Sequence, residues 1–573
     1  MSHTTAPVHG EPSATIDEAL AQPTLCAAFQ VTASANAERP ALRHVGAAAA
    51  DALTFAQAAA RVERIAGGLA AHGFAASDTL ALMLDNRNEF HLADLAALHL
   101  GGLPFSIYHS NPAEKIIPLL ENARSRIAVV EPHYAPVLRE VRRRRPDLLE
   151  TVVVVDEHAG EGDLTLAELE ATTPPADFDF TATWQAVRPD SLGMLIHTSG
   201  TTGEPKGAEW THGAMMDNLR GFHQLVPVSP EGRIVSYLTM AHLAERFMSH
   251  QGMIAYGLTV TSAPYLALGE ALREVQPTRF FGVPRIYEKL AEPARALAAS
   301  DPAGARAALG FAQAEYLGSS AAPARVDILA LFDSLGLTLI ENWGMSETGM
   351  TLINPPQAVR AGTVGKPVPG VEARLADDGE LLIRGPIFTR YRDDPDRTRE
   401  AFEGGWLHTG DVATVDVDGY YTIVDRKKDI IINSAGKNMA PVYIESVIKQ
   451  QSPLFAYVAA IGDGRKYVTA LLTLDEEQLA AFCAARGLEG SHAELARHPE
   501  VTAEVARAIA DANAQLARVE QIKRFQIMPE PWLPGTELVT SSMKLRRRAI
   551  NARFSDEIEA LYDESDRAEP RSG

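Results

Sequence analysis

The sequence predicts an α/β protein that has a large N-terminal domain of layered sheets and a smaller α+β domain at its C-terminus. Short apolar runs rich in β-branched residues alternate with helical periodicity up to about residue 340, a pattern typical of parallel sheets covered by helices. Beyond about Gly362 the runs become shorter and are separated by turns, which predicts a small antiparallel barrel or sheet. A charged segment at residues 425–428 then precedes a region of roughly 130 residues, the size of a separate domain.

In the large domain, the apolar run at residues 79–84 predicts a buried strand, and the pattern at residues 62–71 predicts an amphipathic helix. Residues 1 to about 22 are largely polar, and we expect them to be flexible. Further strands are expected at residues 127–130, 151–155, 193–197, 233–238, 259–262, 279–282 and 338–341.

Four short strands are expected to form the barrel-like subdomain, at residues 371–375, 380–384, 412–417 and 420–424. The C-terminal domain is expected to contain a helix at residues 441–450 and strands at residues 458–461 and 468–474. We therefore place the two domains at residues 1–426 and 427–573.

Composition restricts the class of protein. The 573 residues exceed what one hydrophobic core usually holds. The net charge is 53 − 74 = −21, and so acidic a chain argues against general binding of nucleic acid, which needs a basic footprint. The four consecutive arginines at residues 142–145 are interpreted as a solvated helix face.

Cysteine content and hydropathy bear on the compartment. Cys26 and Cys483 are the two cysteines of the sequence, which argues against a disulfide framework and favours a reducing cytoplasm. The N-terminus lacks an apolar core, so no signal peptide is expected. The sequence has no stretch of roughly 18 apolar residues, so no transmembrane helix is expected. A peripheral contact with the inner face of the membrane stays open, as does the choice between a monomer and a homodimer.

The strongest local motif is the segment at residues 197–207, which follows an apolar run. Its glycines let backbone amides face outward, and its hydroxyls and one lysine add donors that suit the phosphates of ATP. The spacing is not that of a Walker loop, because Lys206 is followed by glycine rather than by serine or threonine. A surface turn is the alternative interpretation. The predicted phosphate ligands are Thr198, Ser199, Gly200, Thr201, Thr202, Gly203 and Lys206.

Residues 199–207, Ser-Gly-Thr-Thr-Gly-Glu-Pro-Lys-Gly, resemble the signature of the adenylate-forming superfamily, which includes acyl-CoA synthetases, peptide-synthetase adenylation domains and luciferases. Residues 343–347, Trp-Gly-Met-Ser-Glu, resemble a second motif of that superfamily. The resemblance implies that Trp343 and Gly344 lie near adenine, that Ser346 bonds the α-phosphate, and that Glu347 holds Mg²⁺ together with Thr202. A hard cation prefers such carboxylate and hydroxyl oxygens.

The match spans about residues 25–550, with six motifs in the order of the family. The small residues Ala321 and Ala322 resemble the segment between adenine and the acyl pocket. Asp411 matches the carboxylate that accepts hydrogen bonds from both ribose hydroxyls. The remaining matches are Arg426 at the ribose, Lys428 at the hinge, Gly436 and Lys437 in the loop for the second half-reaction, and Lys544 as the catalytic lysine of adenylation.

Three further segments, at residues 240–246, 280–289 and 425–428, resemble long-chain fatty acyl-CoA synthetases, including the bubblegum-type branch. His242 matches a position where these synthetases have a residue near the substrate carboxylate. The alternative is that His242 is a structural histidine. The resemblance implies that the enzyme first joins the acid to the α-phosphate of ATP and releases pyrophosphate. The C-terminal domain then rotates about Lys428, so that coenzyme A can take the acyl group. The expected acid is a medium- to long-chain fatty acid.

Other functions stay open at this point. The enzyme could load a carrier protein instead of coenzyme A, or its acid could be aryl, branched or steroid-like. A nucleotide-binding protein without catalysis would be expected to have lost Glu347 or Lys544, and the sequence keeps both. The acyl chain length cannot be deduced from the motifs.

Overall fold

A computed structural model describes residues 14–156, 160, 162–199, 205–298, 300–434, 436–540 and 543–563. The chain divides into two compact units. The first comprises Met1–Arg374, Leu382–His408 and Val415–Tyr421, and the second comprises Leu375–Leu381, Thr409–Thr414 and Thr422–Gly573. The α/β class with a large N-terminal and a smaller C-terminal part is thereby confirmed. The exact boundary after Arg426 stays a prediction.

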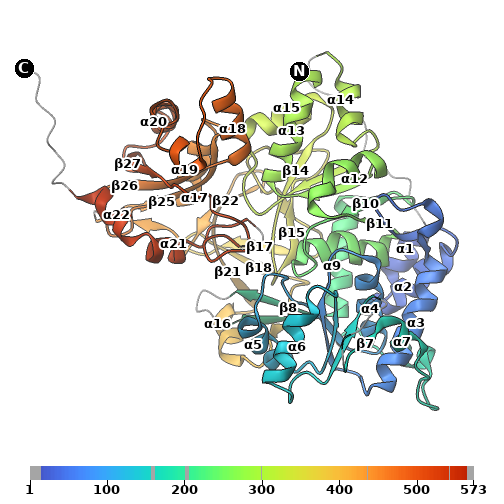
Figure 1. Cartoon of the computed structure of the whole chain (residues 1–573). Coiled ribbons are helices and arrows are strands. Elements are labelled where there is room, and N and C mark those ends of the chain that lie inside the picture. The colour runs from blue at the N-terminus through green and yellow to red at the C-terminus, as the bar shows by residue number, and fades with distance from the viewer. Residues whose placement is uncertain are drawn as a thin grey trace, which may run out of the picture. The chain divides into compact units, whose positions relative to one another are not determined.

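A nine-stranded sheet organises the first unit, and its middle strands run parallel (Figure 1). Its hydrophobic strands are buried on both faces, as parallel strands covered by helices must be. The order is β16 (Lys366–Pro367), β15 (Gly349–Ile353), β14 (Leu339–Met345), β13 (Tyr316–Ser319), β12 (Arg279–Gly282), β10 (Arg233–Ser236), β11 (Thr259–Ser262), β1 (Pro40–His44) and β2 (Leu53–Thr54).

A second, five-stranded parallel sheet completes the layers of this unit. One of its faces packs on α5 (Ala113–Ala123) and α6 (Ala135–Arg144) through a hydrophobic core that includes Ala81, Val130 and Leu138. The strand order is β4 (Leu103–Ser106), β3 (Thr79–Met83), β5 (Ile127–Val130), β6 (Thr151–Val154) and β7 (Leu164–Thr165). The strands predicted at residues 79–84, 127–130 and 151–155 are therefore confirmed.

Helices cover both sheets, and Figure 1 shows α12, α13, α14 and α15 gathered beside the nine-stranded sheet, where they share one core with β10, β12, β13 and β14. The α-helices of the first unit are α1 (Ala14–Ala21), α2 (Leu25–Ala35), α3 (Phe55–Ala71), α4 (Asn88–His99), α5 (Ala113–Ala123), α6 (Ala135–Arg144), α7 (Leu166–Ala171), α8 (Phe180–Gln185), α9 (His212–Leu225), α10 (Leu243–Glu245), α11 (Gly252–Tyr256), α12 (Leu268–Val275), α13 (Pro284–Ala298), α14 (Pro302–Leu309), α15 (Val326–Ser334) and α16 (Pro395–Ala401). Three short irregular helices are η1 (Ala49–Asp51), η2 (Arg246–Gln251) and η3 (Tyr265–Ala267).

The N-terminal prediction is wrong in part. Residues 1–22 were expected to be flexible, but α1 (Ala14–Ala21) is a helix that buries Ile16, Ala19 and Leu20. These positions recur at helical spacing, and Arg220 fixes the end of the helix by donating to the Leu20 carbonyl at 2.6 Å. The helix predicted at residues 62–71 begins earlier, at Phe55, because Thr54 forms a capping box there.

An antiparallel hairpin carries the predicted phosphate segment. It consists of β8 (Leu192–Ser199) and β9 (Pro205–Thr211), and the short β19 (Arg390–Tyr391) pairs with the outer side of β9. The predicted strand at residues 193–197 thus continues to Ser199 and pairs antiparallel with β9. A Walker loop, by contrast, runs from a strand into a helix.

The second unit has its own core, around a three-stranded sheet in the order β25 (Phe455–Ile461), β26 (Val468–Leu474) and β27 (Ile522–Ile527). A small hairpin joins β23 (Ile431–Ile432) to β24 (Asn438–Met439). The helices are α17 (Pro441–Lys449), α18 (Glu476–Ala484), α19 (His492–Leu495), α20 (Pro499–Asn513), α21 (Arg547–Arg553) and α22 (Ser555–Tyr562). The predicted helix and both predicted strands of this domain are confirmed.

The predicted barrel-like region is a five-stranded sheet between residues 372 and 426. Its strand order is β17-β18-β21-β20, and β22 pairs with β21. The bounds are β17 (Glu372–Leu375), β18 (Glu380–Arg384), β20 (Phe402–Glu403), β21 (Trp406–Val415) and β22 (Tyr421–Arg426).

Two surface features bear on the function classes considered above. The arginine run at residues 142–145 lies at the end of α6, and each of its side chains forms an ion pair with a carboxylate: Arg142 with Asp163, Arg143 with Glu140, Arg144 with Glu140 and Glu114, and Arg145 with Glu121 and Asp147. Within the part of the chain that the structure describes, no helix combines the length and hydropathy needed to span a membrane.

Candidate active site

The parallel strands of the nine-stranded sheet end together, and several of the predicted site residues of the first unit follow these ends. Gly282 of β12 lies beside Ser319 of β13, which lies beside Glu341 of β14. Ligands of open α/β sheets bind beyond the carboxyl ends of the strands. His242 follows β10, Ala321 and Ala322 follow β13, and the motif at residues 343–347 extends from β14.

The motif at residues 343–347 forms a second hairpin. Trp343 and Gly344 belong to β14, which pairs antiparallel with β15, whereas the strand was expected to end at Glu341. The strand extends further because it pairs with β15. The two strands approach each other closely at Gly344, where a β-carbon would lie 2.0 Å from the Gly349 carbonyl oxygen. The hairpin therefore requires glycine at position 344 and presents Ser346 and Glu347 at its turn.

The Glu347 side chain is only 6% exposed, and its position is fixed by two contacts. The Tyr391 hydroxyl donates to Glu347 Oε1 at 2.8 Å, and the Phe388 amide donates to the Glu347 carbonyl at 2.9 Å. Ser346 is fixed in turn by Trp210, whose indole donates to the Ser346 carbonyl at 3.0 Å. A buried, oriented carboxylate suits a hard divalent cation such as Mg²⁺.

The phosphate hairpin places Thr198 directly across from Lys206 and Ser199 across from Pro205. The Lys206 ammonium lies 5.2 Å from the centre of the Tyr391 ring, within the range of a cation–π interaction. The predicted ligands Gly200, Thr201, Thr202 and Gly203 lie outside the described residues.

His242 begins α10, and its half-buried side chain caps that helix. The Ala244 amide donates to His242 Nδ1 at 3.2 Å. This contact supports the structural alternative. Ala321 has a φ of 79° and is exposed together with Ala322. Positive φ is strained for a residue other than glycine and is often found at functional loops.

In the second unit, the two residues predicted at the ribose pair with each other. Arg426 Nε lies 2.6 Å from Asp411 Oδ1, and Asp411 is 4% exposed. Lys427 holds the residue before Asp411 in place. Its amide donates to the Gly410 carbonyl at 2.8 Å, and its ammonium lies 2.9 Å from Glu380. The opposite oxygen of Glu380 accepts from the Gly410 amide at 2.9 Å. These contacts orient the Asp411 carboxylate.

Lys544 lies within electrostatic range of Asp411 and Arg426. Desolvation lowers the pKa of Lys544 from its usual value, the positive charge of Arg426 lowers it further, and Asp411 acts in the opposite direction. Lys544 keeps an exposed surface, so screening by water limits the contribution of desolvation. Its main chain is fixed by Thr540, whose hydroxyl accepts from the Lys544 amide at 2.9 Å.

The residues predicted at the hinge and in the second-step loop are exposed. Lys428 follows β22, and Gly436 and Lys437 lie in the turn between β23 and β24. Gly436 has a φ of 74°, a conformation that glycine adopts without strain. The Asn433 side chain closes this turn by accepting from the Lys437 amide at 2.9 Å.

Sequence reasoning missed Tyr391 and Lys427. Tyr391 stands between two arginines in an otherwise polar segment, where nothing marks it as a site residue. Lys427 lies within the charged run at residues 425–428, which provided only a weak signal because such a run is usually a solvated turn.

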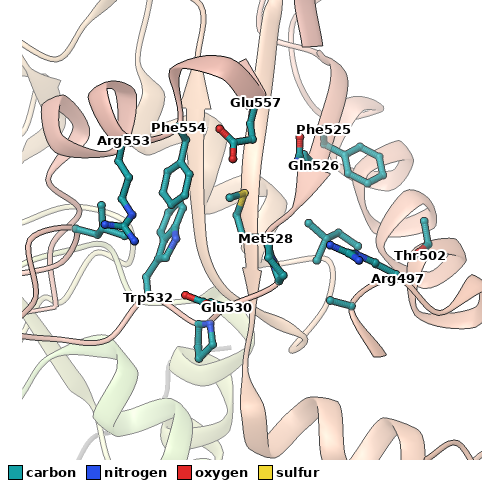
Figure 2. A pocket seen from close by; sticks show the side chains of 15 residues that line it. Arg497, Thr502, Phe525, Gln526, Met528, Glu530, Trp532, Arg553, Phe554 and Glu557 are labelled. Atoms are coloured by element: carbon teal, nitrogen blue, oxygen red, sulfur yellow. The ribbon is translucent and has the colours of Figure 1, made fainter. Parts of the chain in front are cut away.

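A cavity of about 610 Å³ lies elsewhere in the second unit, and Figure 2 shows the Trp532 and Phe554 rings against each other on its wall. None of the predicted site residues that the structure describes lines this cavity. Its charged lining consists of Arg497, Arg553, Glu530 and Glu557, so no net charge favours a ligand of either sign.

Comparison with protein families gives two matches. The family described as AMP-binding enzyme matches residues 29–391, and the family described as AMP-binding enzyme C-terminal domain matches residues 428–566. The putative fatty-acid–CoA ligase fadD11 of Mycobacterium tuberculosis is 41% identical over 449 residues, which cover 70% of this chain and 79% of that protein. The long-chain-fatty-acid–CoA ligase FadD15 of Mycobacterium bovis is 31% identical over 563 residues, which cover 89% and 92%.

Solved structures share the fold. The anthranilate CoA ligase AuaEII in complex with anthranoyl-AMP aligns with a TM-score of 0.75 at 20% identity, covering 94% of this chain and 98% of that one. The adenylation domain of a carboxylate reductase from Mycobacterium chelonae aligns with a TM-score of 0.78 at 20% identity, covering 96% and 93%.

Proposed function

Because this chain belongs to the AMP-binding enzyme family, it is an AMP-forming acyl-CoA synthetase, and we propose that its substrate is a medium- to long-chain fatty acid. The enzyme uses ATP to activate the acid and transfers the acyl group to coenzyme A. The likeness to two fatty-acid–CoA ligases over more than two thirds of the chain carries this conclusion. The length of the acyl chain is the part that the proposal adds.

In the first step, a carboxylate oxygen of the acid attacks the α-phosphorus of ATP. A bond forms between this oxygen and the α-phosphorus. The bond between the α-phosphorus and the oxygen that bridges to the β-phosphate breaks, and pyrophosphate leaves. Negative charge gathers on the phosphate oxygens in the transition state, where preorganised positive groups stabilise it. We assign this role to Lys544 and Lys206. Asp411, held by Arg426, binds the ribose, and Trp343 lies near adenine.

Glu347, with its buried and oriented carboxylate, is the residue that would hold Mg²⁺, with Thr202 as a second ligand. When bound, the cation would neutralise part of the phosphate charge. In the second step, the thiol of coenzyme A attacks the acyl carbonyl and AMP leaves. We assign Gly436 and Lys437 to this step, and Lys428 to the hinge of a mobile C-terminal domain at residues 427–573.

Two alternatives concern the substrates. The first is a carrier protein in place of coenzyme A. The second is an aryl, branched or steroid-like acid, and the likeness to an anthranilate ligase does not favour it, because 20% identity supports the fold alone.

A screen of pyrophosphate release across carboxylic acids tests the substrate class. Straight-chain acids of about 6 to 18 carbons, benzoates, branched acids and a steroid acid would each be offered with ATP and Mg²⁺ at matched concentration. We expect the highest kcat/KM within the straight-chain series. Turnover of an aryl or steroid acid with no turnover of any straight-chain acid would contradict the proposal.

A further inference from the structure

The short strand β19 brings Tyr391 into contact with two predicted site residues that lie far from it in sequence. The Tyr391 hydroxyl donates to Glu347 Oε1 at 2.8 Å. The Lys206 ammonium lies 5.2 Å from the centre of the Tyr391 ring. One side chain therefore contacts both the predicted cation ligand and the predicted phosphate lysine, and it does so with two different parts of its structure.

The pairing of β19 with β9 explains the contact with Lys206. Tyr391 lies opposite Ala208, and Lys206 is two residues before Ala208 on the same strand. Side chains two residues apart on a strand point to the same face, and diagonal neighbours across two strands are within reach of an aromatic ring. The register of β19 thus sets which lysine lies over the ring.

Ion pairs and main-chain bonds hold this register. Glu209 is 2% exposed and accepts Arg390 at 2.7 Å and Arg392 at 2.9 Å, so the two neighbours of Tyr391 clamp one buried carboxylate. The Arg392 amide donates to the Gly207 carbonyl at 2.7 Å. Tyr391 is itself 7% exposed, and its amide donates to the Thr398 hydroxyl at 3.0 Å. Tyr391 therefore has little freedom to move.

The segment before Tyr391 fixes the main chain of Glu347 as well. The Phe388 amide donates to the Glu347 carbonyl at 2.9 Å, and the Phe388 ring lies 4.9 Å from the Tyr391 ring. Glu347 is thus held at its main chain by Phe388 and at its carboxylate by Tyr391. With Oε1 engaged by the tyrosine hydroxyl, the orientation of Oε2 is set before any ligand binds.

From this geometry we propose that Tyr391 is a positioning residue that orients the Glu347 carboxylate through its hydroxyl and the Lys206 ammonium through its ring. The proposal rests on the adenylating function proposed above. Tyr391 acts on the reaction through these two neighbours. Its hydroxyl governs the affinity for the divalent cation, and its ring governs the affinity for the ATP phosphates.

The variants Tyr391→Phe and Tyr391→Leu separate the two parts. Binding of Mn²⁺, a paramagnetic substitute for Mg²⁺, is followed by electron paramagnetic resonance in the presence of α,β-methylene ATP, which cannot release pyrophosphate. We expect Tyr391→Phe to weaken Mn²⁺ binding about 10- to 100-fold, the usual effect of losing the partner of a metal ligand. Binding of the analogue without metal should stay at the wild-type value, because the ring remains.

Tyr391→Leu removes the ring as well, so it should weaken both Mn²⁺ binding and metal-free analogue binding. Tyr420→Phe is the matched control, because Tyr420 is 5% exposed, donates its hydroxyl to the Ala358 carbonyl at 2.6 Å, and has Arg360 over its ring at 4.1 Å. This control should leave both affinities unchanged. Thermal unfolding of each variant reports whether it is folded, and Tyr391→Phe keeps its ring in the core.

A double-mutant cycle with Glu347→Gln tests whether Tyr391 acts through Glu347. In the Glu347→Gln background, Tyr391→Phe should cause no further loss of Mn²⁺ affinity. Wild-type Mn²⁺ affinity in Tyr391→Phe would overturn the proposal, as would full additivity in the cycle. These binding measurements do not depend on turnover. Failure of the wild-type enzyme to form acyl-AMP would therefore refute the proposed function without deciding the role of Tyr391.

Discussion

At the scale of single residues, the proposed function depends on side chains whose positions are held by neighbouring residues. Glu347 is held by Tyr391, and Asp411 is held by Arg426. Oriented donors and acceptors stabilise charge without the cost of reorganising during the reaction. The second unit places Lys544 within electrostatic range of Asp411 and Arg426, which supports its assignment to the adenylation step.

Replacement of Lys544, the proposed catalytic lysine, should separate the two half-reactions. We expect Lys544→Ala to lower acyl-AMP formation at least about 10²- to 10³-fold, because one preorganised positive group is lost. Exchange of labelled pyrophosphate into ATP measures this step. Thioesterification of supplied acyl-AMP should stay near the wild-type rate. Lys523→Ala, at an exposed position of β27, is the control, and equal loss of both half-reactions would argue against the role of Lys544.

Replacement of Asp411, the proposed ribose ligand, should mainly weaken the binding of ATP. We expect Asp411→Ala to raise the KM for ATP roughly 10- to 100-fold, the effect of losing hydrogen bonds to a charged group. Steady-state pyrophosphate release measures the change. Asp511→Ala, which removes an exposed carboxylate from α20, should leave the KM unchanged. A KM for ATP that Asp411→Ala does not alter would rule out the ribose assignment.

Site residues could be predicted from sequence where a motif carries them. Glu347 and Asp411 were predicted as site residues because their neighbours form recognisable motifs, and both residues are buried in the structure. Tyr391 could not be found in this way. Its contacts depend on the pairing of β19 with β9, which joins segments that are distant in sequence and whose register a single sequence does not reveal.

At the scale of elements, α10 (Leu243–Glu245) buries a carboxyl group directly after the half-buried His242. Glu245 is 4% exposed, and burial raises its pKa to about 7. The Leu238 amide donates to Glu245 Oε2 at 3.2 Å, while Oε1 has no hydrogen-bond partner among the described residues. Glu245 thus links the segment after β10 to α10, and its burial favours the protonated form although the Leu238 amide favours the carboxylate.

This burial makes stability depend on pH. The folded-state pKa of Glu245 lies above its ordinary value of 4.5, so its stabilising contribution is fully present below about pH 4.5 and is lost as the pH rises through 7. The difference corresponds to about 3 kcal/mol. We expect the Tm of Glu245→Gln to rise relative to the wild type between pH 5 and pH 8. A Tm difference that stays constant over this range would contradict the prediction, and Glu270→Gln, on the exposed side of α12, is the control.

The elements themselves were predicted best where the pattern is local. The strands at residues 259–262 and 279–282 were predicted to the residue, because short β-branched or aromatic runs bounded by turns define them. The extension of β14 through Trp343 and Gly344 was missed, since it depends on the partner strand β15. The helix α1 was missed because three apolar positions in a polar segment are a weak signal.

At the scale of the whole molecule, the sequence predicted two parts, and the structure has two compact units, each with its own hydrophobic core. The division is not a single cut, because residues 375–381 and 409–414 group with the second unit. A pattern along the chain cannot reveal such excursions, since they depend on contacts between segments that are distant in sequence. The placement of Asp411 beside Arg426 follows from this arrangement.

The most direct test of the central claim identifies all products of one reaction. The enzyme would be incubated with ATP, Mg²⁺ and a straight-chain fatty acid, with and without coenzyme A, and the products resolved by mass spectrometry. We predict acyl-AMP and pyrophosphate without coenzyme A, and acyl-CoA with equal amounts of AMP and pyrophosphate when it is present. Formation of ADP and phosphate, or an acyl-AMP that coenzyme A does not consume, would contradict the account.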